Sequence, residues 1–341
     1  MKIAVGISGG VDSSVAAWIL REQGHAVIGI WMNLFGNESS AIDAEKVCEF
    51  LNIPFYKIDL QNEYKNLVIS YIKDEYALGK TPNPCVMCNR GVKFGQFIEK
   101  ALSSGLDFEY FATGHYSIIE QDNKTKRYLL KKGVHEGKDQ AYFLSMLQQD
   151  QLSRIIFPLG GKTKPEVRKI AEKAGLFTTD KRESQDLCSG DYRDFIVDSK
   201  GSGNFVDNKG LILGKHKGIE NYTIGQRRGL GISSSTDPYY VIGIKPENNE
   251  VILGFNNDLL NKGMIVSRCN WIAVEKPNFP IIVDAKIRYR DNGSPATLTE
   301  IKEDTIQVLF DNERRAVTPG QIGVFYIGDS VLGAGIIEKG F

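Results

Sequence analysis

A short glycine-rich turn between a strand-like and a helix-like segment constrains the fold of this chain more than any other feature. Residues 2–7 form an apolar run that predicts a β-strand, and residues 12–23 carry apolar side chains at helical spacing. The turn that joins them is Ser-Gly-Gly-Val-Asp-Ser-Ser, from Ser8 to Ser14. Glycines let the backbone approach a ligand, and amides at a helix start attract anions, so the turn predicts a phosphate-binding loop. An ordinary capped glycine turn is the alternative.

Strands and helices continue to alternate after this turn. Further strands are predicted at residues 26–32, 55–60 and 110–113, and further helices at 44–51, 63–78 and 164–174. Thr163 and Glu166 predict a capping box at the start of the last helix, with Pro165 in its first turn. Such alternation is typical of a doubly wound α/β domain, in which helices cover both faces of a parallel sheet.

The pattern changes to glycine-rich, short β-like runs after about Ser199. Strands are then predicted at 281–289, 296–301, 305–310 and 323–327, with turns at 291–293 and 311–312. This succession favours a small antiparallel barrel. We therefore predict an α/β domain over residues 1–200, a small β-rich domain over 201–262 and a C-terminal β-barrel over 263–341.

Length and charge limit the function further. A chain of 341 residues is too long for one ordinary core. It has no apolar run of the roughly 20 residues that a membrane span needs, and residues 1–7 lead into a strand without a secretory signal, so we expect a cytosolic protein with no membrane partner. Lys plus Arg and Asp plus Glu are both 42, so any nucleic-acid site must be a local patch.

The five cysteines form an odd number without an export signal, which favours reduced thiols over a disulfide framework. Cys85 and Cys88 lie three positions apart near the end of a segment with two prolines, residues 81–89, which we expect to be an exposed loop. Structural zinc or incidental cysteines remain alternatives, although three cysteines do not close a zinc site. The third cysteine with a loop-like, charged context is Cys188. The two expected to be packed core thiols are Cys48 and Cys269.

The segment Ser8–Ser13 resembles the pyrophosphate loop of the ATP pyrophosphatases, which adenylate a substrate and release pyrophosphate. The contexts of Cys88 and Cys188, together with further motifs, resemble the tRNA 2-thiouridylase family. These motifs stand in the family's order from residue 3 to about residue 338, and they are 112–116, 138–140, 222–227, 288–290 and 318–321. The resemblance covers almost the whole chain, and it implies the adenine nucleotide α-hydrolase-like fold for the first domain.

The resemblance implies a reaction and a set of residues. In that family, ATP activates the C2 oxygen of the wobble uridine in the tRNA anticodon as an adenylate, a persulfide sulfur attacks C2, and AMP leaves. Asp12 beside phosphates is expected to hold Mg²⁺ or a backbone amide. The sulfur of the persulfide is expected to come from a relay protein or from sulfide. The residues implied for ATP are Gly6, Ile7, Ser8, Gly9, Gly10, Val11, Asp12, Ser13, Met32 and Gly114.

The resemblance also implies a second set of residues, which serve catalysis and tRNA binding. Cys188 would carry the persulfide and Cys88 would be its partner nucleophile. The flipped base would lie against Asn83, Pro84 and Cys85. The residues that would touch tRNA elsewhere are His115, Lys138, Asp139, Gln140, Arg288, Tyr289 and Gln321. Without the motif, His115 could equally be a strand-end histidine, and residues 288–290 a solvated strand face.

The chain departs from the family at two positions. Cys85 stands where many members carry Asp, and Ser189 stands where Phe is usual. Three thiols, from Cys85, Cys88 and Cys188, match a [4Fe–4S] cluster with one open iron, which favours a cluster over the persulfide route. Two other functions stay open: an enzyme of the same fold that acts on a small metabolite, and a non-catalytic RNA-binding protein with a structural metal. The paired cysteines argue against the first, and the phosphate loop argues against the second.

Overall fold

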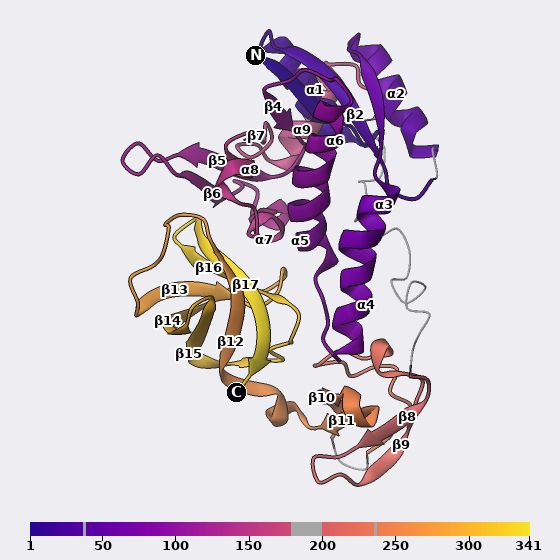
Figure 1. The fold of residues 1–341 in the computed structure, drawn as a ribbon, viewed down its shortest axis with the longest axis vertical. Helices are drawn as coiled ribbons and strands as arrows, with labels where there is room; N and C mark the ends of the chain where they lie inside the picture. The colour runs from indigo at the N-terminus through magenta and orange to yellow at the C-terminus, as the bar shows by residue number, and fades with distance from the viewer. Residues whose placement is uncertain (37–38, 179–199, 235–236) are drawn as a thin grey trace.

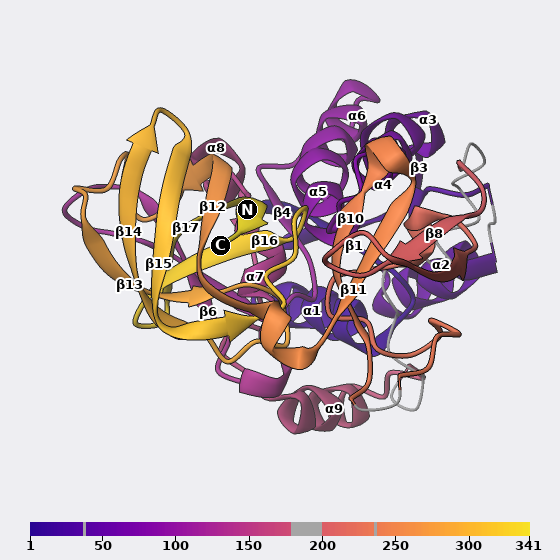
Figure 2. The same ribbon diagram turned by 90° about the horizontal axis from the view of Figure 1, so that it is seen from below.

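The computed structural model describes residues 1–36, 39–178, 200–234 and 237–341. Figure 1 shows three parts: an α/β domain that contains the N-terminus, a small β domain beside the end of α4, and a barrel that ends at the C-terminus. Figure 2, seen from below, places the barrel and the strands β10 and β11 on opposite sides of the molecule. Among the helices described, none has the length and apolar character needed to cross a membrane.

A five-stranded parallel sheet forms the α/β domain, in the order β3-β2-β1-β4-β7. The strands are β1 (Lys2–Gly6), β2 (Ala26–Asn33), β3 (Phe55–Asp59), β4 (Tyr110–Ala112) and β7 (Ile155–Ile156). Ile3 and Val5 of β1 face one buried cluster and Ala4 faces another, as period-two alternation requires. This confirms the predicted doubly wound α/β class.

Helices cover both faces of this sheet. One face packs against α1 (Val11–Glu22), α2 (Ser39–Leu51) and α9 (Lys164–Lys173). The predicted capping box of α9 is confirmed, since the backbone amide of Thr163 donates to Glu166 Oε2 over 2.7 Å. Cys48 lies on α2 at 1% exposure, as predicted, and burial raises the pKa of its thiol to about 12.

The other face of the sheet is covered by helical segments that the sequence pattern predicted only in part. The predicted helix at 63–78 is composed of α3 (Gln61–Tyr64), the π-helix η1 (Lys65–Ile69) and α4 (Ser70–Ala77). A second helical run, which was not predicted, comprises α5 (Pro84–Cys88), the π-helix η2 (Asn89–Gln96) and α6 (Phe97–Ser103). Short elements follow, namely the helices η3 (Glu136–Lys138), α7 (Ala141–Leu144) and α8 (Gln149–Leu152).

The expectation of an exposed loop at 81–89 is wrong for its second half. Pro84 occupies the first turn of α5 instead of preventing a helix, because a proline there has a suitable φ and needs no amide donor. Asn83 is the N-cap, and its side chain accepts a hydrogen bond from the Val86 amide. The cysteines of the C-x-x-C motif therefore lie on a helix.

The small domain contains a four-stranded sheet in the order β10-β11-β8-β9. Its strands are β8 (Gly203–Val206), β9 (Ile212–His216), β10 (Tyr240–Lys245) and β11 (Glu250–Gly254), and η5 (Ile219–Asn221), η6 (Pro246–Asn248) and η7 (Asn256–Leu259) are short 3₁₀ turns. Phe205, Tyr222, Val241 and Val251 are among its core residues.

Six antiparallel strands close into the predicted barrel through the pairing of β12 with β17. They are β12 (Leu260–Trp271), β13 (Ile281–Lys286), β14 (Ser294–Lys302), β15 (Thr305–Arg315), β16 (Ile322–Ile327) and β17 (Ser330–Gly340). The connection between β13 and β14 contains the predicted residues 291–293, but its hydrogen-bonded turn comes earlier, since the Asp291 amide donates to the Arg288 carbonyl over 3.1 Å and β13 already ends at Lys286. The turn predicted at 311–312 is wrong, because β15 continues to Arg315 and its pairing with β12 shifts register there.

The barrel is joined to the α/β domain by more than the chain connection. A hairpin of β5 (Ser117–Gln121) and β6 (Tyr128–Lys132), which was not predicted, extends the barrel sheet at the edge of β17. One buried apolar cluster contains Phe94 and Phe97 of the α/β domain together with Ile322 and Ala334 of the barrel. The two domains therefore share a core.

Candidate active site

The turn from Ser8 to Gly10 forms the predicted cradle at the start of α1. Gly10 is the N-cap, with extended backbone angles. The Ser13 hydroxyl donates to the Gly10 carbonyl over 3.1 Å and accepts from the Ser8 amide over 3.2 Å. Gly9 has φ +78, and a Cβ there would lie 2.6 Å from Asp43 Cβ on α2. Only glycine fits this position, and the turn is held tightly against α2.

The residues predicted for the nucleotide gather at the carboxyl edge of the sheet. Gly6 ends β1, Met32 lies near the end of the adjacent β2, and Gly114 follows β4, which pairs with β1 on the other side. A Cβ on Gly114 would lie 2.7 Å from the carbonyl carbon of Asp12. Ligands of open parallel sheets bind at this edge, where the strand order reverses.

Asp12 has partners that differ from those expected. Two side chains contact its carboxylate. Lys164 Nζ lies 2.7 Å and 2.8 Å from its two carboxylate oxygens, and the Tyr116 hydroxyl donates to Oδ1 over 2.7 Å. The Lys164 side chain is 8% exposed and that of Asp12 is 28% exposed. Sequence reasoning missed Lys164, because nothing in the start of a capped helix signals a partner 152 residues away.

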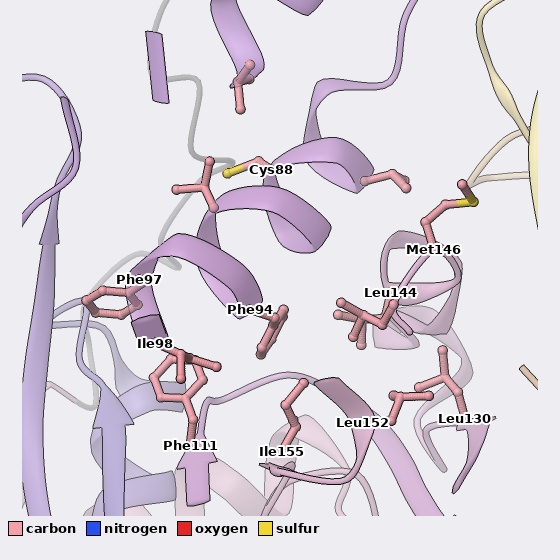
Figure 3. Packing of buried hydrophobic residues seen from close by; sticks show 14 of the residues in the cluster. Cys88, Phe94, Phe97, Ile98, Phe111, Leu130, Leu144, Met146, Leu152 and Ile155 are labelled. Atoms are coloured by element: carbon pink, nitrogen blue, oxygen red, sulfur yellow. The ribbon is translucent and has the colours of Figure 1, made fainter. Parts of the chain in front are cut away.

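Cys85 and Cys88 lie on α5, where positions i and i+3 share one side of a helix. Cys88 is 2% exposed and belongs to the apolar cluster shared with the barrel. Figure 3 shows it on the helical run that leads to Phe94 and Phe97. Cys188, predicted as the persulfide carrier, lies outside the described residues, as does Ser189. No group of three potential metal-binding side chains occurs within the part of the chain that is described.

His115 connects the cradle to the cysteine-bearing helical run. It follows Gly114, and its Nδ1 lies 2.6 Å from the Thr113 hydroxyl. Its Nε2 lies 3.5 Å from Lys93 Nζ on η2, and its ring packs against Phe94. Burial and the Lys93 ammonium lower the pKa of His115 well below the usual range, so the ring is neutral at pH 7.

The residues predicted to touch tRNA divide into internal and surface positions. Asp139 is 8% exposed and accepts from the amides of Gly133 and Ala141, and burial raises the pKa of its carboxyl. Gln140 accepts from the Tyr116 amide over 2.9 Å. These two side chains order the chain around η3. Lys138 and Gln140 are half-buried, whereas Asp139 is buried.

Three further expected tRNA contacts come from the barrel. Arg288 is exposed after the end of β13. Tyr289 packs against Phe143 of α7, with ring centroids 4.4 Å apart and the ring planes tilted by 38°. Gln321 precedes β16, and its amide donates to the carbonyls of Thr81 and Pro82. The barrel therefore brings Tyr289 and Gln321 to the segments around α5 and α7.

Comparisons with known proteins agree with this architecture. Residues 1–189 match the family described as the tRNA methyl transferase HUP domain, 193–255 its PRC-barrel domain, and 261–337 the aminomethyltransferase beta-barrel domain. The tRNA-specific 2-thiouridylase MnmA of Clostridioides difficile is 46% identical over 99% of this chain and 98% of its own length. A protein of the same description from Caldanaerobacter subterraneus is 48% identical over 99% and 98%.

A solved 4-thiouridine synthetase–RNA complex with bound ATP aligns only weakly, at TM-score 0.38 and 19% identity over 53% of this chain and 43% of that one. The relatives of 46% and 48% identity, in contrast, match along nearly the full length of both chains. The three family domains also follow one another in the same chain order as the three parts of the fold. This chain belongs to the tRNA-specific 2-thiouridylase family.

Proposed function

We propose that this protein is an ATP-dependent sulfurtransferase that forms 2-thiouridine at the wobble position of tRNA anticodons. One observation carries the proposal: continuous contacts join an anion cradle to a helix with two cysteines. Gly114 lies against the first turn of α1, and the next residue, His115, contacts Lys93 and Phe94 on the helical run that begins with α5. A nucleotide at the cradle would place its phosphates within reach of a substrate held near α5.

The cradle supports the first half-reaction. The C2 oxygen of uridine attacks the α-phosphorus of ATP, the bond to the β-phosphate oxygen breaks, and pyrophosphate leaves. The amides at the start of α1 and the hydroxyls of Ser8 and Ser13 would bind the phosphates. Because Lys164 occupies both oxygens of Asp12, that carboxylate is no ready Mg²⁺ ligand. The Mg²⁺ that accompanies ATP would be held mainly by phosphate oxygens and water.

Thiols would serve the second half-reaction. The terminal sulfur of a Cys188 persulfide attacks C2, and the C2–O bond breaks as AMP leaves with the oxygen. The Cys88 thiolate then attacks the Cys188 sulfur, so that the thiouridine is released and a disulfide forms, which a reductant must reopen. A sulfur-carrying protein would regenerate the persulfide by passing the outer sulfur of its own persulfide to the reduced Cys188 thiolate, and its own thiol would be released. Sulfide would regenerate it only in place of the reductant, by attacking the Cys188 sulfur of the disulfide and releasing the Cys88 thiolate.

A [4Fe–4S] cluster is the second sulfur route that we propose to test. Cys85 and Cys88 fit as two ligands, because they share one side of α5. When bound, such a cluster would hold an activated sulfide on an open iron. Cys85→Asp should weaken iron binding after anaerobic reconstitution if the cluster forms, as measured by iron and sulfide content. Full activity of metal-free wild-type protein would leave the persulfide route.

Methyl transfer is the competing chemistry, because the matched family domains carry that description. A methyltransferase needs a methyl donor and releases neither AMP nor pyrophosphate. The cradle formed by Ser8, Gly9 and Gly10 fits phosphates, which supports adenylation.

An assay with tRNA, ATP and sulfide tests the proposal. We expect AMP, pyrophosphate and 2-thiouridine from the wild type. Gly10→Val should stop all three, because its side chain would obstruct the approach of phosphate to the backbone. Cys88→Ser and Cys188→Ser should keep AMP-linked activation measurable but form no thiouridine. Methylated uridine without AMP formation would contradict the proposal.

We also propose the domain boundaries 1–200, 201–262 and 263–341. The start of β8 at Gly203 supports the first, whereas β12 already begins at Leu260, close to the second. Limited proteolysis followed by mass spectrometry would test them, since cleavage is expected near residues 200 and 260.

A further inference from the structure

The segment that leads into the cysteine helix is held by the barrel. It runs from Lys80 to Asn83, between α4 and α5. The Thr81 amide donates to the Pro319 carbonyl over 2.8 Å. The side-chain amide of Gln321 donates to the carbonyls of Thr81, over 2.9 Å, and Pro82, over 3.2 Å. Three backbone groups before α5 are therefore satisfied by the residues that precede β16.

This contact is too close to tolerate a side chain. Gly320 has φ +88, and a Cβ there would lie 2.9 Å from both the carbonyl carbon and the carbonyl oxygen of Thr81. The Lys80 ammonium lies 2.7 Å from Glu338 of β17, which adds an ion pair at the same boundary. The barrel and the segment before α5 thus meet backbone to backbone.

A buried hydrogen-bond relay continues from this contact into α5 itself. The Asn83 side chain accepts from the Val86 amide over 3.3 Å and lies beside the Tyr142 hydroxyl. That hydroxyl donates to the Ile322 carbonyl over 3.0 Å, and Tyr142 is 1% exposed. The N-cap of the cysteine helix is therefore tied to the first residue of β16.

The helical run is held in the same manner beyond the cysteines. The side-chain amide of Gln151, on α8, donates to the carbonyls of Arg90, over 2.8 Å, and Phe94, over 2.9 Å. Cys85 and Cys88 thus lie between two glutamines that each bridge two backbone carbonyls. One of these glutamines belongs to the α/β domain and the other to the barrel.

We infer that Gln321 is a positioning residue that, with Tyr142, sets the place of Cys85 and Cys88 through the start of α5, and that this role acts on the thiol step apart from any contact of Gln321 with tRNA. The inference rests on the proposed function for its activity readout. Reacting groups misplaced by about 1 Å can lose 100-fold in rate, so a loosened helix start should slow sulfur transfer.

Three variants test this role against a matched control. Gln321→Ala removes the donor, Gln321→Glu keeps the shape but turns an acceptor towards two carbonyls, and Tyr142→Phe removes only the hydroxyl of the relay. The control is Gln121→Ala, because Gln121 also donates to one backbone carbonyl, that of Lys126 over 3.0 Å, but does so on the exposed β5–β6 hairpin.

Single-turnover thiolation, tRNA binding and ATP–pyrophosphate exchange should separate the steps. We expect Gln321→Ala and Tyr142→Phe to lower the thiolation rate by about 10- to 100-fold, and Gln321→Glu to lower it at least as much. Rates are compared at saturating tRNA, so that a lost contact between Gln321 and tRNA does not enter them, and the ATP–pyrophosphate exchange rate should stay within about 2-fold of wild type. A thiolation rate at saturating tRNA within about 2-fold of wild type would overturn the inference, because it would leave Gln321 with a tRNA contact alone.

Hydrogen exchange gives a readout that needs no activity. The Val86 amide, which Asn83 caps, should exchange about 10-fold faster in Gln321→Ala and in Tyr142→Phe than in wild type and in Gln121→Ala. Unchanged exchange at Val86 would overturn the positioning role. If the wild type makes no thiouridine, the proposed function fails, whereas the exchange data still decide whether the barrel holds α5.

Discussion

The pair of Lys164 and Asp12 permits a quantitative prediction, because the two side chains differ in burial and meet at the head of the cradle. Replacing Lys164 by Met removes the ammonium and keeps most of the apolar stem. Exposed ion pairs contribute about 0–1 kcal/mol, whereas removing one partner of a buried pair costs about 3–5 kcal/mol. With Lys164 at 8% exposure and Asp12 at 28%, we expect an intermediate loss. It should be about 2 kcal/mol in the free energy of unfolding.

The double variant isolates the pair. Asp12→Asn keeps the shape at position 12 and removes the charge, so the combination with Lys164→Met no longer buries an uncompensated charge. The sum of the losses in free energy of unfolding in the two single variants should therefore exceed the loss in the double variant, and the difference, the coupling energy, should be about 1–2 kcal/mol. Tyr116, which donates to the same carboxylate, remains in all three proteins.

Urea unfolding followed by tryptophan fluorescence measures these energies. A Trp271→Phe background leaves the signal to Trp18 and Trp31, which both lie in the α/β domain. Release of pyrophosphate from ATP should fall by about 10-fold in Lys164→Met, since Asp12 lies in the first turn of α1. A coupling energy below about 0.5 kcal/mol together with normal pyrophosphate release would refute this reasoning.

Four further outcomes are expected. Gly9→Ala should abolish pyrophosphate release and destabilise the fold more than Gly24→Ala, because both glycines have a φ near +80 but no atom lies within 4 Å of a Cβ added to Gly24. If both variants lose the same free energy of unfolding, the backbone angle alone accounts for the loss and the contact with α2 does not. Because the pKa of His115 is lowered in the folded state, its contribution to the free energy of unfolding is complete above pH 6.5 and should fall by up to about 1.4 kcal/mol per pH unit below it. In His115→Phe, the free energies of unfolding measured at pH 5.5 and at pH 7.5 should therefore differ less than in wild type. Mass spectrometry after iodoacetamide treatment at pH 8 should find Cys48 unmodified, because its thiol is buried with a raised pKa; early labelling would contradict the packing of α2. Arg288→Ala should reduce the slope of log affinity for tRNA against log salt by about 0.7–0.9, and an unchanged slope would remove it from the tRNA surface.

Local signals in the sequence determined the elements that depend only on neighbouring residues. The first strand, the glycine turn and α1 were predicted in order, because an apolar run, flexible glycines and helical spacing all lie within residues 2–23. The capping box at Thr163 was predicted for the same reason, since its two partners are three residues apart. The barrel class also followed from short alternating runs.

Local signals misled where one residue type has two structural uses. Pro84 disfavours the interior of a helix but suits its first turn, and the choice depended on Asn83 as a cap. The polar pair at 311–312 is typical of a turn, yet pairing with β12 keeps β15 extended through it.

Tertiary structure alone decided which side chains meet. The sequence named Asp12 and Gln321 as site residues, but it could not give the partners that now define their roles. Lys164 lies 152 residues from Asp12, and Thr81 lies 240 residues from Gln321. Such pairs leave no periodic trace, because they arise only after the sheet order brings α9 beside α1 and the barrel closes against the segment before α5. Short sequence motifs identified the reacting and binding residues, whereas the packing of domains that lie far apart in the chain determined how those residues are arranged.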